Sequence, residues 1–403
     1  MEIKNVSNEV GESYCVRGRI ISKKNFGHLI FLNIQDETGI LQLSVHDQDN
    51  HPLFDTVRKD VKVWDILQAT GKIYFTDKGT KTLRLNTNIE VLSKFRGHHI
   101  DKYHGIKNYD VMTRVEQIIL DKKLFDTLQF RSQMYFVIRQ FMHQKGFFEV
   151  ETPILLNEEN TSKASSFTTI LSDKNKNMYL RKTSEQHLKK MIIAGFGSVY
   201  ELGKVFRNEG ISKYYQPEFS ALEVYKSYAT YQDMQDLLFE MFQHIETELS
   251  LQRTLCSFET YTFNDFIGTS DYSMDDNAVV LEKFTNKLRS QRERNILITH
   301  FPAWINPLTK LNTSGLSEEF RFYVNGEMLA QGTSELTDYD EQKQRLIQQA
   351  QNHNKEYDPE LDTFLHALKI GMPPCGGFGL GIDRLVIYYK TAKNIREVIL
   401  FPK

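Results

Sequence analysis

The chain has 403 residues, of which 25% are charged and 40% hydrophobic, and its formal net charge is −2 at pH 7. This composition is ordinary for a soluble globular protein, and the length allows two or three domains. The nearly neutral charge excludes nucleic-acid binding by bulk charge, so any such contact requires a local basic patch.

The three cysteines, Cys15, Cys256 and Cys375, form no CxxC pair. Their spacing argues against a disulfide framework or a zinc site and favours buried thiols in a reducing compartment. The first residues contain no apolar signal core, and no apolar run reaches the roughly 18 residues of a membrane span. We therefore expect a cytoplasmic protein without membrane contact.

Short apolar runs separated by turn signals predict five strands, at residues 14–21, 29–34, 40–45, 66–75 and 82–91. They fit a small closed barrel of the OB type, which often binds oligonucleotides through aromatic and basic side chains. Phe31 is a candidate for base stacking, and Lys23 and Lys24 are candidates for phosphate contacts. Further positive charge is available from Lys72, Lys78, Lys81 and Arg84. A plain barrel with Phe31 in its core and with lysines that only solvate it explains the same residues.

Two stretches of this barrel carry a family resemblance, VRGRIISKKNFGHLIFLNIQDETGILQL and WDILQATGKIYFTDKGTKTLRL. Both are similar to the anticodon-binding barrel of lysyl-tRNA synthetases. The resemblance places Phe31 where that family stacks an anticodon base. It does not extend to a glutamate that the family carries near residues 79–82, because this chain reads GTKT there.

We interpret residues 1–98 as this first domain, residues 99–130 as a linker and residues 131–403 as a second domain. An amphipathic helix is predicted at 131–145, followed by a strand that precedes Pro153. The apolar positions of the helix are Met134, Val137, Ile138, Phe141 and Met142. The segment resembles motif 1 of class II aminoacyl-tRNA synthetases, which forms their dimer interface, so the resemblance implies a homodimer.

Residues 180–228 predict two antiparallel strands joined by a polar loop. Strand periodicity places Glu223 and Tyr225 on one face. An arginine fork suits a carboxylate or phosphate, and carboxylates suit an ammonium group. We expect Arg207, Glu209, Glu223 and Tyr225 to line one polar pocket, although a hairpin with satisfied ion pairs would explain the FRNE sequence alone. The full stretch closely resembles motif 2 of the class II enzymes, and its sequence is similar to that of the lysine branch.

Residues 229–300 are expected to be mostly helical, with an insertion around 250–295 that is shorter than in the lysine enzymes. Residues 320–337 predict a strand, a turn at Asn325 and Gly326, and a return strand. Residues 376–386, GGFGLGIDRLV, predict a glycine-rich strand that leads into a helix. With the C-terminal IREVILFP this stretch resembles motif 3. The resemblance spans residues 14–402 and implies an α+β protein, with an OB barrel and a catalytic antiparallel sheet flanked by helices.

The resemblance implies an ATP-dependent reaction in two steps, formation of an aminoacyl-adenylate and transfer of the acyl group to tRNA. For ATP, it implies contacts from Arg207, Glu209, Gln216, Phe219 and Arg384. Arg207 would hold the α-phosphate, Arg384 the far phosphate, and Phe219 would stack on adenine. Arg207 and Arg384 would be the catalytic pair.

For the amino acid, the resemblance implies contacts from Glu185, Arg207, Glu223, Tyr225, Gln331 and Glu335. Glu185 would take the α-ammonium group and Arg207 the carboxylate. Glu223, Tyr225 and Glu335 would take a side-chain ammonium, so the expected substrate is lysine or a similar basic amino acid. Gln331 and Thr333 stand where the family has an asparagine and a phenylalanine, which predicts a larger and more polar pocket.

The chain departs from the family at the phosphates. Arg321 and Met328 stand where the family has two carboxylates that hold Mg²⁺, and neither suits that ion. Mg²⁺ therefore lacks its usual ligands, and the metal site is left unassigned. Either Arg321 replaces the metal as a fixed positive charge, or ATP binds poorly; Glu327 should point to the other face unless a bulge re-aims it. Tyr215 also replaces a phosphate-binding histidine.

Three functions are consistent with these residues. The first, which we favour, is ATP-dependent ligation of a basic amino acid to tRNA. The second is activation of such an amino acid for an acceptor other than tRNA. The third is a non-catalytic paralogue that binds amino acid, nucleotide or tRNA.

Overall fold

The computed structural model describes the chain except for residues 98–111, 160–163, 269–276, 307, 353–356 and 358–361. It divides into two compact units, residues 1–108 and residues 109–403. Among the described helices, none combines the length and apolar character that crossing a bilayer requires.

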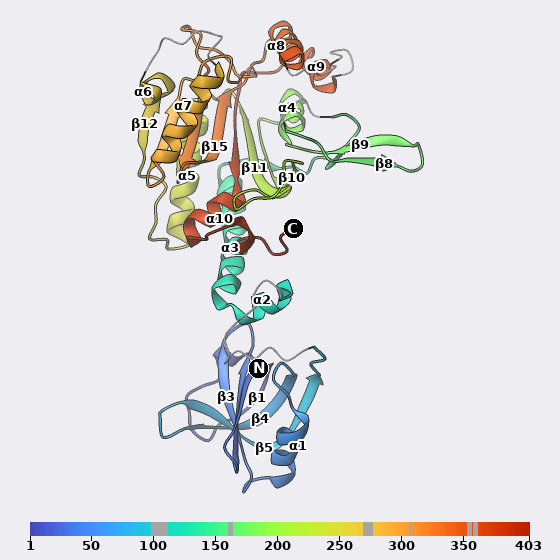
Figure 1. Cartoon of the computed structure of the whole chain (residues 1–403), viewed down its shortest axis with the longest axis vertical. Coiled ribbons are helices and arrows are strands. Elements are labelled where there is room, and N and C mark those ends of the chain that lie inside the picture. The colour runs from blue at the N-terminus through green and yellow to red at the C-terminus, as the bar shows by residue number, and fades with distance from the viewer. Residues whose placement is uncertain (98–111, 160–163, 269–276, 307, 353–356, 358–361) are drawn as a thin grey trace. The chain divides into compact units, whose positions relative to one another are not determined.

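The first unit is a closed barrel of five strands in the order β1-β2-β3-β5-β4 (Figure 1). The strands are β1 (Ser13–Asn25), β2 (Leu29–Gln35), β3 (Ile40–His46), β4 (Ile66–Phe75) and β5 (Lys81–Ser93). The predicted strands and the OB-type barrel are confirmed. A short 3-10 helix, η1 (Ile3–Asn5), precedes the barrel, and α1 (His51–Asp60) lies between β3 and β4 in the chain. The sequence analysis missed α1, although Asn50 caps it by accepting a hydrogen bond from the Leu53 N–H.

The second unit is built on an eight-stranded sheet in the order β12-β13-β14-β15-β16-β11-β10-β6. Its strands are β6 (Phe148–Glu149), β10 (Ser198–Phe206), β11 (Glu218–Ser227), β12 (Glu259–Thr262), β13 (Asn295–Thr299), β14 (Glu319–Val324), β15 (Glu327–Ser334) and β16 (Cys375–Gly381). The β6–β10 and β12–β13 pairs are parallel and the others antiparallel. A smaller sheet contains β7 (Leu155–Leu156), β8 (Thr168–Leu171) and β9 (Lys176–Leu180).

The helices of this unit confirm the α+β class. They are α2 (Arg114–Leu120), α3 (Lys122–Gln144), α4 (Glu185–Ile193), α5 (Tyr231–Glu248), α6 (Phe263–Ile267), α7 (Asn277–Ser290), α8 (Tyr339–Asn352), α9 (Thr363–Leu368), α10 (Ile382–Lys390) and the 3-10 helix η5 (Ile395–Glu397). Helix α3 begins at Lys122, nine residues before its predicted start, because Asp121 caps it through the Leu124 N–H. Part of the predicted linker is therefore helix of the second unit.

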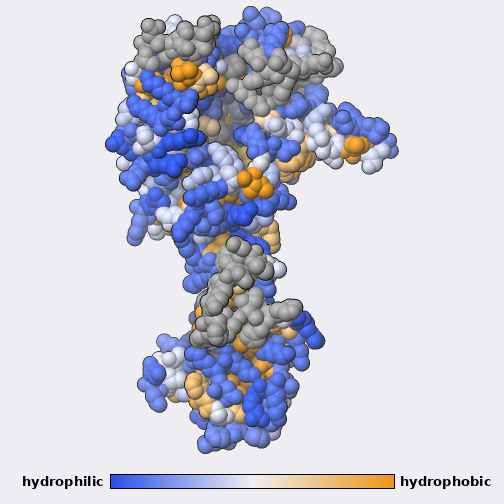
Figure 2. Space-filling view, in the orientation of Figure 1, coloured by the Kyte–Doolittle hydropathy of each residue, from blue (hydrophilic) through white to orange (hydrophobic). Residues whose placement is uncertain are grey.

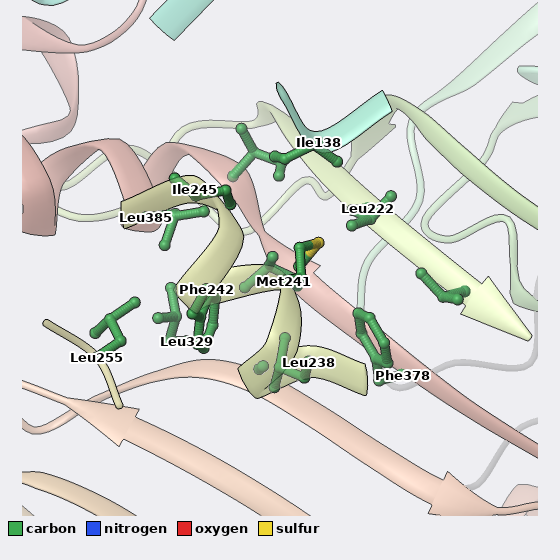
Figure 3. Close-up of a cluster of buried hydrophobic side chains, with 14 of the residues drawn as sticks. Ile138, Leu222, Leu238, Met241, Phe242, Ile245, Leu255, Leu329, Phe378 and Leu385 are labelled. Carbon is green, nitrogen blue, oxygen red and sulfur yellow. The ribbon is translucent and has the colours of Figure 1, made fainter. Parts of the chain in front are cut away.

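One face of the large sheet is buried under helices. Helix α5 packs its side chains onto apolar residues of β11, β16 and α10 (Figure 3). The labelled members of this cluster include Leu222, Leu238, Met241, Phe242, Ile245, Phe378 and Leu385. Alternation along each strand leaves the opposite face available for polar side chains.

The apolar stripe predicted on α3 is buried within its own chain, since Met134, Val137, Ile138, Phe141 and Met142 all belong to this core. The stripe therefore gives no reason to expect a partner subunit. Other apolar side chains nearby are exposed, with Phe136 at 68% and Phe148 at 60%. Figure 2 shows a mostly hydrophilic surface on the face in view, interrupted by small hydrophobic patches.

A buried arginine joins the elements that carry the second unit's polar face. Arg131 on α3 contacts Asp383 on α10 (Nη1–Oδ1 2.5 Å) and donates to the Ser220 hydroxyl on β11 (2.9 Å) and to the Val398 carbonyl (3.1 Å). The Ser220 N–H in turn donates to Asp383 Oδ2 (2.9 Å). Both charges are satisfied by several partners, which makes burial of the pair tolerable. The pair fixes the start of α10, where Arg384 follows directly.

We expect the Arg131→Met variant to lose about 3–5 kcal/mol of unfolding free energy in the second unit, because Asp383 would remain buried without its cation. Trp304 fluorescence in a Trp64→Phe background reports unfolding of that unit alone, since these are the chain's two tryptophans. The control is Arg139→Met, which breaks an exposed pair with Glu149 and should cost less than about 1 kcal/mol. Equal losses in the two variants would contradict this role of Arg131.

Candidate active site

Two rows of neighbouring residues cross the large sheet on its polar side. Residues directly opposite one another on paired strands share a face. The first row contains Glu201, Glu223, Gly379, Gln331 and Arg321. The second row contains Tyr225, Gly377, Thr333 and Glu319. The rows confirm that Glu223 and Tyr225 lie on one face, as the sequence predicted.

The glycines of β16 make room for side chains of the neighbouring strand. A methyl group at Gly377 would lie 2.4 Å from the Tyr225 ring, and one at Gly379 would lie 3.0 Å from the Glu223 carboxylate. The sequence suggested that these glycines admit a flat ligand or a tight helix–sheet contact. At these two positions the structure gives a third reason, because the glycines accommodate the side chains that form the pocket floor.

A cavity of about 330 Å³ opens over these rows. Every residue assigned from the sequence to the amino acid or to ATP lines it, namely Glu185, Arg207, Glu209, Gln216, Phe219, Glu223, Tyr225, Gln331, Glu335 and Arg384. The structure therefore confirms that one pocket is lined by Arg207, Glu209, Glu223 and Tyr225. The role of each residue stays a prediction.

Glu223 is a buried carboxylate on the floor of the cavity. The Thr183 hydroxyl donates to its Oε1 (3.1 Å), and no described residue forms an ion pair with it. Burial raises the pKa of Glu223 to about 8, and the nearby charge of Glu185 adds to that effect. A carboxylate in this position is stabilised either by a proton or by a cationic ligand.

Two further carboxylates of the cavity, Glu185 and Glu335, share an internal cation. The Lys189 ammonium lies 2.6 Å from Glu185 Oε1 and 2.5 Å from Glu335 Oε2. Glu335 also accepts a hydrogen bond from the Thr333 hydroxyl (2.7 Å). Burial by itself would lower the pKa of Lys189, but Glu185 and Glu335 more than offset it, so that pKa is raised and the ammonium is charged.

The other end of the cavity is basic and aromatic. The Arg207 guanidinium lies 5.2 Å from the centre of the Phe219 ring, and that of Arg384 lies 5.2 Å from the centre of the Tyr215 ring. Arg384 also donates to the Met328 carbonyl. Two guanidinium groups beside aromatic rings suit a ligand with a flat base and several phosphate oxygens.

Arg321 is directed away from this basic end. Its Nε contacts Glu319 Oε1 (2.5 Å), and its guanidinium lies 4.3 Å from the centre of the Phe301 ring. Glu319 is fully buried and also accepts from Gln331 Nε2 (2.8 Å). Arg321 is not among the described residues that line the cavity. Of the two possibilities drawn from the sequence, the structure therefore does not favour Arg321 as a charge beside the phosphates.

The β14–β15 hairpin contains an irregularity that changes which side chains reach the cavity. Met328 pairs with Tyr323, and Ala330 pairs with Phe322, so Leu329 is an extra residue. Met328 lines the cavity. The Glu327 carboxylate accepts from the Tyr215 hydroxyl (3.3 Å) and lies 4.0 Å from Arg384. Glu327 thus contacts two cavity-lining side chains.

In the barrel, the three nucleic-acid candidates have different surroundings. The Lys23 ammonium donates to the carbonyl groups of Val57, Arg58 and Val61 at 2.7–3.0 Å and so closes the end of α1. Burial lowers the pKa of Lys23. Phe31 is partly exposed, and Lys24 pairs with it across β1 and β2. Phe31 and Lys24 are therefore placed on one surface, whereas Lys23 has a structural role.

Sequence reasoning missed Lys189, Thr183 and Glu319 as parts of this site. Lys189 could have been found, because it follows Glu185 by four residues and so shares its face of a helix. The contact of Thr183 with Glu223 depends on how distant segments pack, which no local pattern in the sequence fixes. Glu319 could have been found, because it lies two residues from Arg321 on one strand and so shares its face.

Comparison with known proteins identifies the families. The family described as tRNA synthetases class II (D, K and N) matches residues 107–403, and the OB-fold nucleic acid binding domain matches residues 14–92. A protein named lysine–tRNA ligase from Carboxydothermus hydrogenoformans is 30% identical over 99% of this chain and 90% of its own length. Proteins of the same name from Clostridium perfringens strain SM101 and Trichormus variabilis are 32% identical over 97–98% of this chain and over 87% and 79% of their own lengths.

We expect Glu223→Gln to remove a pH-dependent loss of stability. The pKa of Glu223 is about 8 in the folded protein, above its usual value near 4.3 when unfolded. The raised pKa therefore makes its full contribution to the stability of the folded protein below a pH of about 4. That contribution is lost as the pH rises through about 8.

Thermal unfolding at pH 6 and pH 9 measures the effect. The unchanged protein should lose more stability between these values than Glu223→Gln does. The control, Glu209→Gln, alters an exposed carboxylate at the mouth of the cavity and should follow the unchanged protein. Identical pH profiles for all three proteins would contradict the raised pKa.

Proposed function

The chain belongs to the class II tRNA synthetases of the group that comprises the D, K and N enzymes, and from this membership we propose that it is a lysine–tRNA ligase. It activates lysine with ATP and transfers the lysyl group to tRNA. The observation that carries the choice of lysine is Glu223, a carboxylate without a cation at the floor of the cavity. The names of the relatives support the same substrate.

The amino-acid end of the cavity supports a lysine bound by both of its ammonium groups. The α-ammonium lies at Glu185, whose side chain is 32% exposed. The ε-ammonium lies at Glu223, beside the Tyr225 ring. Arg207, at the mouth of the cavity, holds the carboxylate through its guanidinium. A neutral side chain would leave Glu223 without a counterion.

The chemistry that follows from this placement is in-line displacement. A carboxylate oxygen of lysine attacks the α-phosphorus of ATP, and pyrophosphate leaves with the electron pair of the broken P–O bond. Arg207 and Arg384 stabilise the developing negative charge, and the cavity holds the reactants in position. A ribose hydroxyl of tRNA then attacks the acyl carbon, and AMP leaves. The barrel supports tRNA as the acceptor through Phe31 and Lys24.

We infer that the two positions at which the family holds Mg²⁺, Arg321 and Met328, do not bind that ion in this chain. No group of three or more His, Cys, Asp or Glu side chains suited to a metal occurs in the described part of the chain. The thioether of Met328 is too soft for Mg²⁺. The Glu319 oxygens are engaged by Arg321, Gln331 and Asn306. We therefore assign charge stabilisation to the two arginines of the cavity.

We also propose that the enzyme is a homodimer that pairs through the outer side of α3 and β6. The exposed rings of Phe136 and Phe148 support this surface. A second cavity of about 650 Å³ lies there and is lined by residues of α3 and the C-terminal segment.

Lysine activation is tested by ATP–pyrophosphate exchange with a panel of amino acids, followed by charging of bulk tRNA. We expect exchange with lysine and not with norleucine, which has the same chain length without the ammonium group. Glu223→Gln should lose a factor of at least 30 in affinity for lysine, corresponding to about 2–5 kcal/mol for truncating one member of a buried charge pair. Exchange with norleucine equal to that with lysine would contradict the assignment.

The same assay tests the metal. Exchange should show a shallow dependence on Mg²⁺, and Met328→Glu should make the dependence steeper and the rate higher, since Met328 lines the cavity and a carboxylate is a ligand that Mg²⁺ accepts. Ile370→Glu adds the same charge at a residue that is 79% exposed and does not line the cavity, so it serves as the control. Brisk and strongly Mg²⁺-dependent exchange by the unchanged protein would contradict the proposal.

The dimer is tested by analytical ultracentrifugation at micromolar concentration. Phe136→Asp should produce monomers, because a charge would be buried at the interface. Ile370→Asp changes a residue that is 79% exposed elsewhere and should leave the dimer intact. A monomeric unchanged protein at every concentration would exclude the homodimer.

A further inference from the structure

Lys189 is a cation built into the floor of the amino-acid cavity. Its ammonium lies within 2.6 Å of carboxylate oxygens of both Glu185 and Glu335, and its side chain is 4% exposed. Its ammonium also lies 5.8 Å from the centre of the Tyr225 ring and 5.7 Å from that of Phe364. Lys189 is therefore held from four directions, by α4, by the segment after β15, by β11 and by α9.

The charges around this ammonium do not cancel. The titratable groups that face it are Glu185 on α4, Glu335 after β15, Glu223 and Tyr225 on β11, and Cys375 on β16. Three of these groups are carboxylates, and Lys189 contacts two of them. Glu223 is left without an ion-pair partner among the described residues.

We propose that Lys189 determines the specificity of the cavity by pairing with Glu185 and Glu335 and leaving Glu223 as the carboxylate that a ligand must neutralise. The cavity therefore accepts an amino acid with one cationic side chain. This inference rests on the proposed function, because it assigns a charge requirement to the same site. A ligand that instead displaced Lys189 would have to move a buried ammonium away from two carboxylates.

Lys189 acts on the ligand through Glu335, so it is a positioning residue. Without it, burial would raise the pKa of Glu335 further, because Lys189 opposes that effect in the intact protein. A protonated Glu335 attracts an ammonium less strongly. Binding of lysine would then require an additional deprotonation, and the loss of affinity would be largest at low pH.

The test is calorimetric binding of L-lysine to the full chain at pH 6.5, 7.5 and 9. Lys189→Met should bind lysine at least tenfold more weakly than the unchanged protein at pH 6.5, and the ratio of the two affinities should shrink toward pH 9. Lys189→Arg, which keeps the cation, should restore binding to within about threefold. The ligand titrates identically in both experiments, so the ratio of the two affinities at each pH cancels the effect of its titration.

Two further variants keep the test decisive. Lys190→Met removes the neighbouring lysine, whose ammonium lies 2.6 Å from the Thr363 hydroxyl outside the cavity, and should bind lysine normally at every pH. Lys189→Met with Glu335→Gln removes both members of the pair, so it should fold even if the single variant does not. The ratio of its lysine affinity to that of the unchanged protein should not vary with pH.

The outcomes separate the two proposals. A loss in Lys189→Met that is the same at all three pH values would mean that Lys189 has only a structural role. Tighter binding by Lys189→Met would mean that Lys189 competes with the ligand. Either result overturns the inference while the proposed function stands. Absence of lysine binding by the unchanged protein would overturn the proposed function, and the inference with it.

Discussion

The cost of keeping the carboxylates of Glu185, Glu223 and Glu335 close together in one cavity is the constraint on which this site depends. Like charges at such distances cannot all be ionised in a protein interior without cations among them. Lys189 supplies one cation to Glu185 and Glu335. Glu223 has a hydrogen bond from Thr183 and, within the part of the chain that the structure describes, no ion-pair partner. In the proposed function, a ligand that brings an ammonium group neutralises Glu223 and so lowers this cost.

The rest of the second unit holds these carboxylates at a fixed spacing. Strand pairing places Glu223, while Glu185 comes from α4 and Glu335 directly follows β15. Gly377 and Gly379 leave space for the side chains of β11. Helices bury the opposite face, and the Arg131–Asp383 pair ties α3 to the start of α10. Arg384 therefore enters the cavity from an element that is anchored in the core. In the proposed function, the residues assigned to the amino acid and to the phosphates are thus positioned by one core.

The sequence predicted the elements well and the contacts between them unevenly. The barrel strands, the motif 2 hairpin and the face shared by Glu223 and Tyr225 follow from local periodicity and turn chemistry. Helix α1, the early start of α3 and the irregularity at Leu329 depend on capping and register, which compete with the apolar pattern. Arg321 contacts Glu319 because both lie on β14, two residues apart. Periodicity places both side chains on one face, but it could not reveal the burial of Glu319, which decides the orientation of Arg321.

A crystal structure of the chain with L-lysine and a non-hydrolysable ATP analogue tests the central claim most directly. The account predicts the ε-ammonium of lysine at hydrogen-bond distance from the Glu223 carboxylate, with Lys189 still between Glu185 and Glu335. The α-carboxylate and the nucleotide phosphates should lie at Arg207 and Arg384. A lysine side chain that occupies the place of Lys189, or a ligand that leaves Glu223 without a cation, would contradict the account.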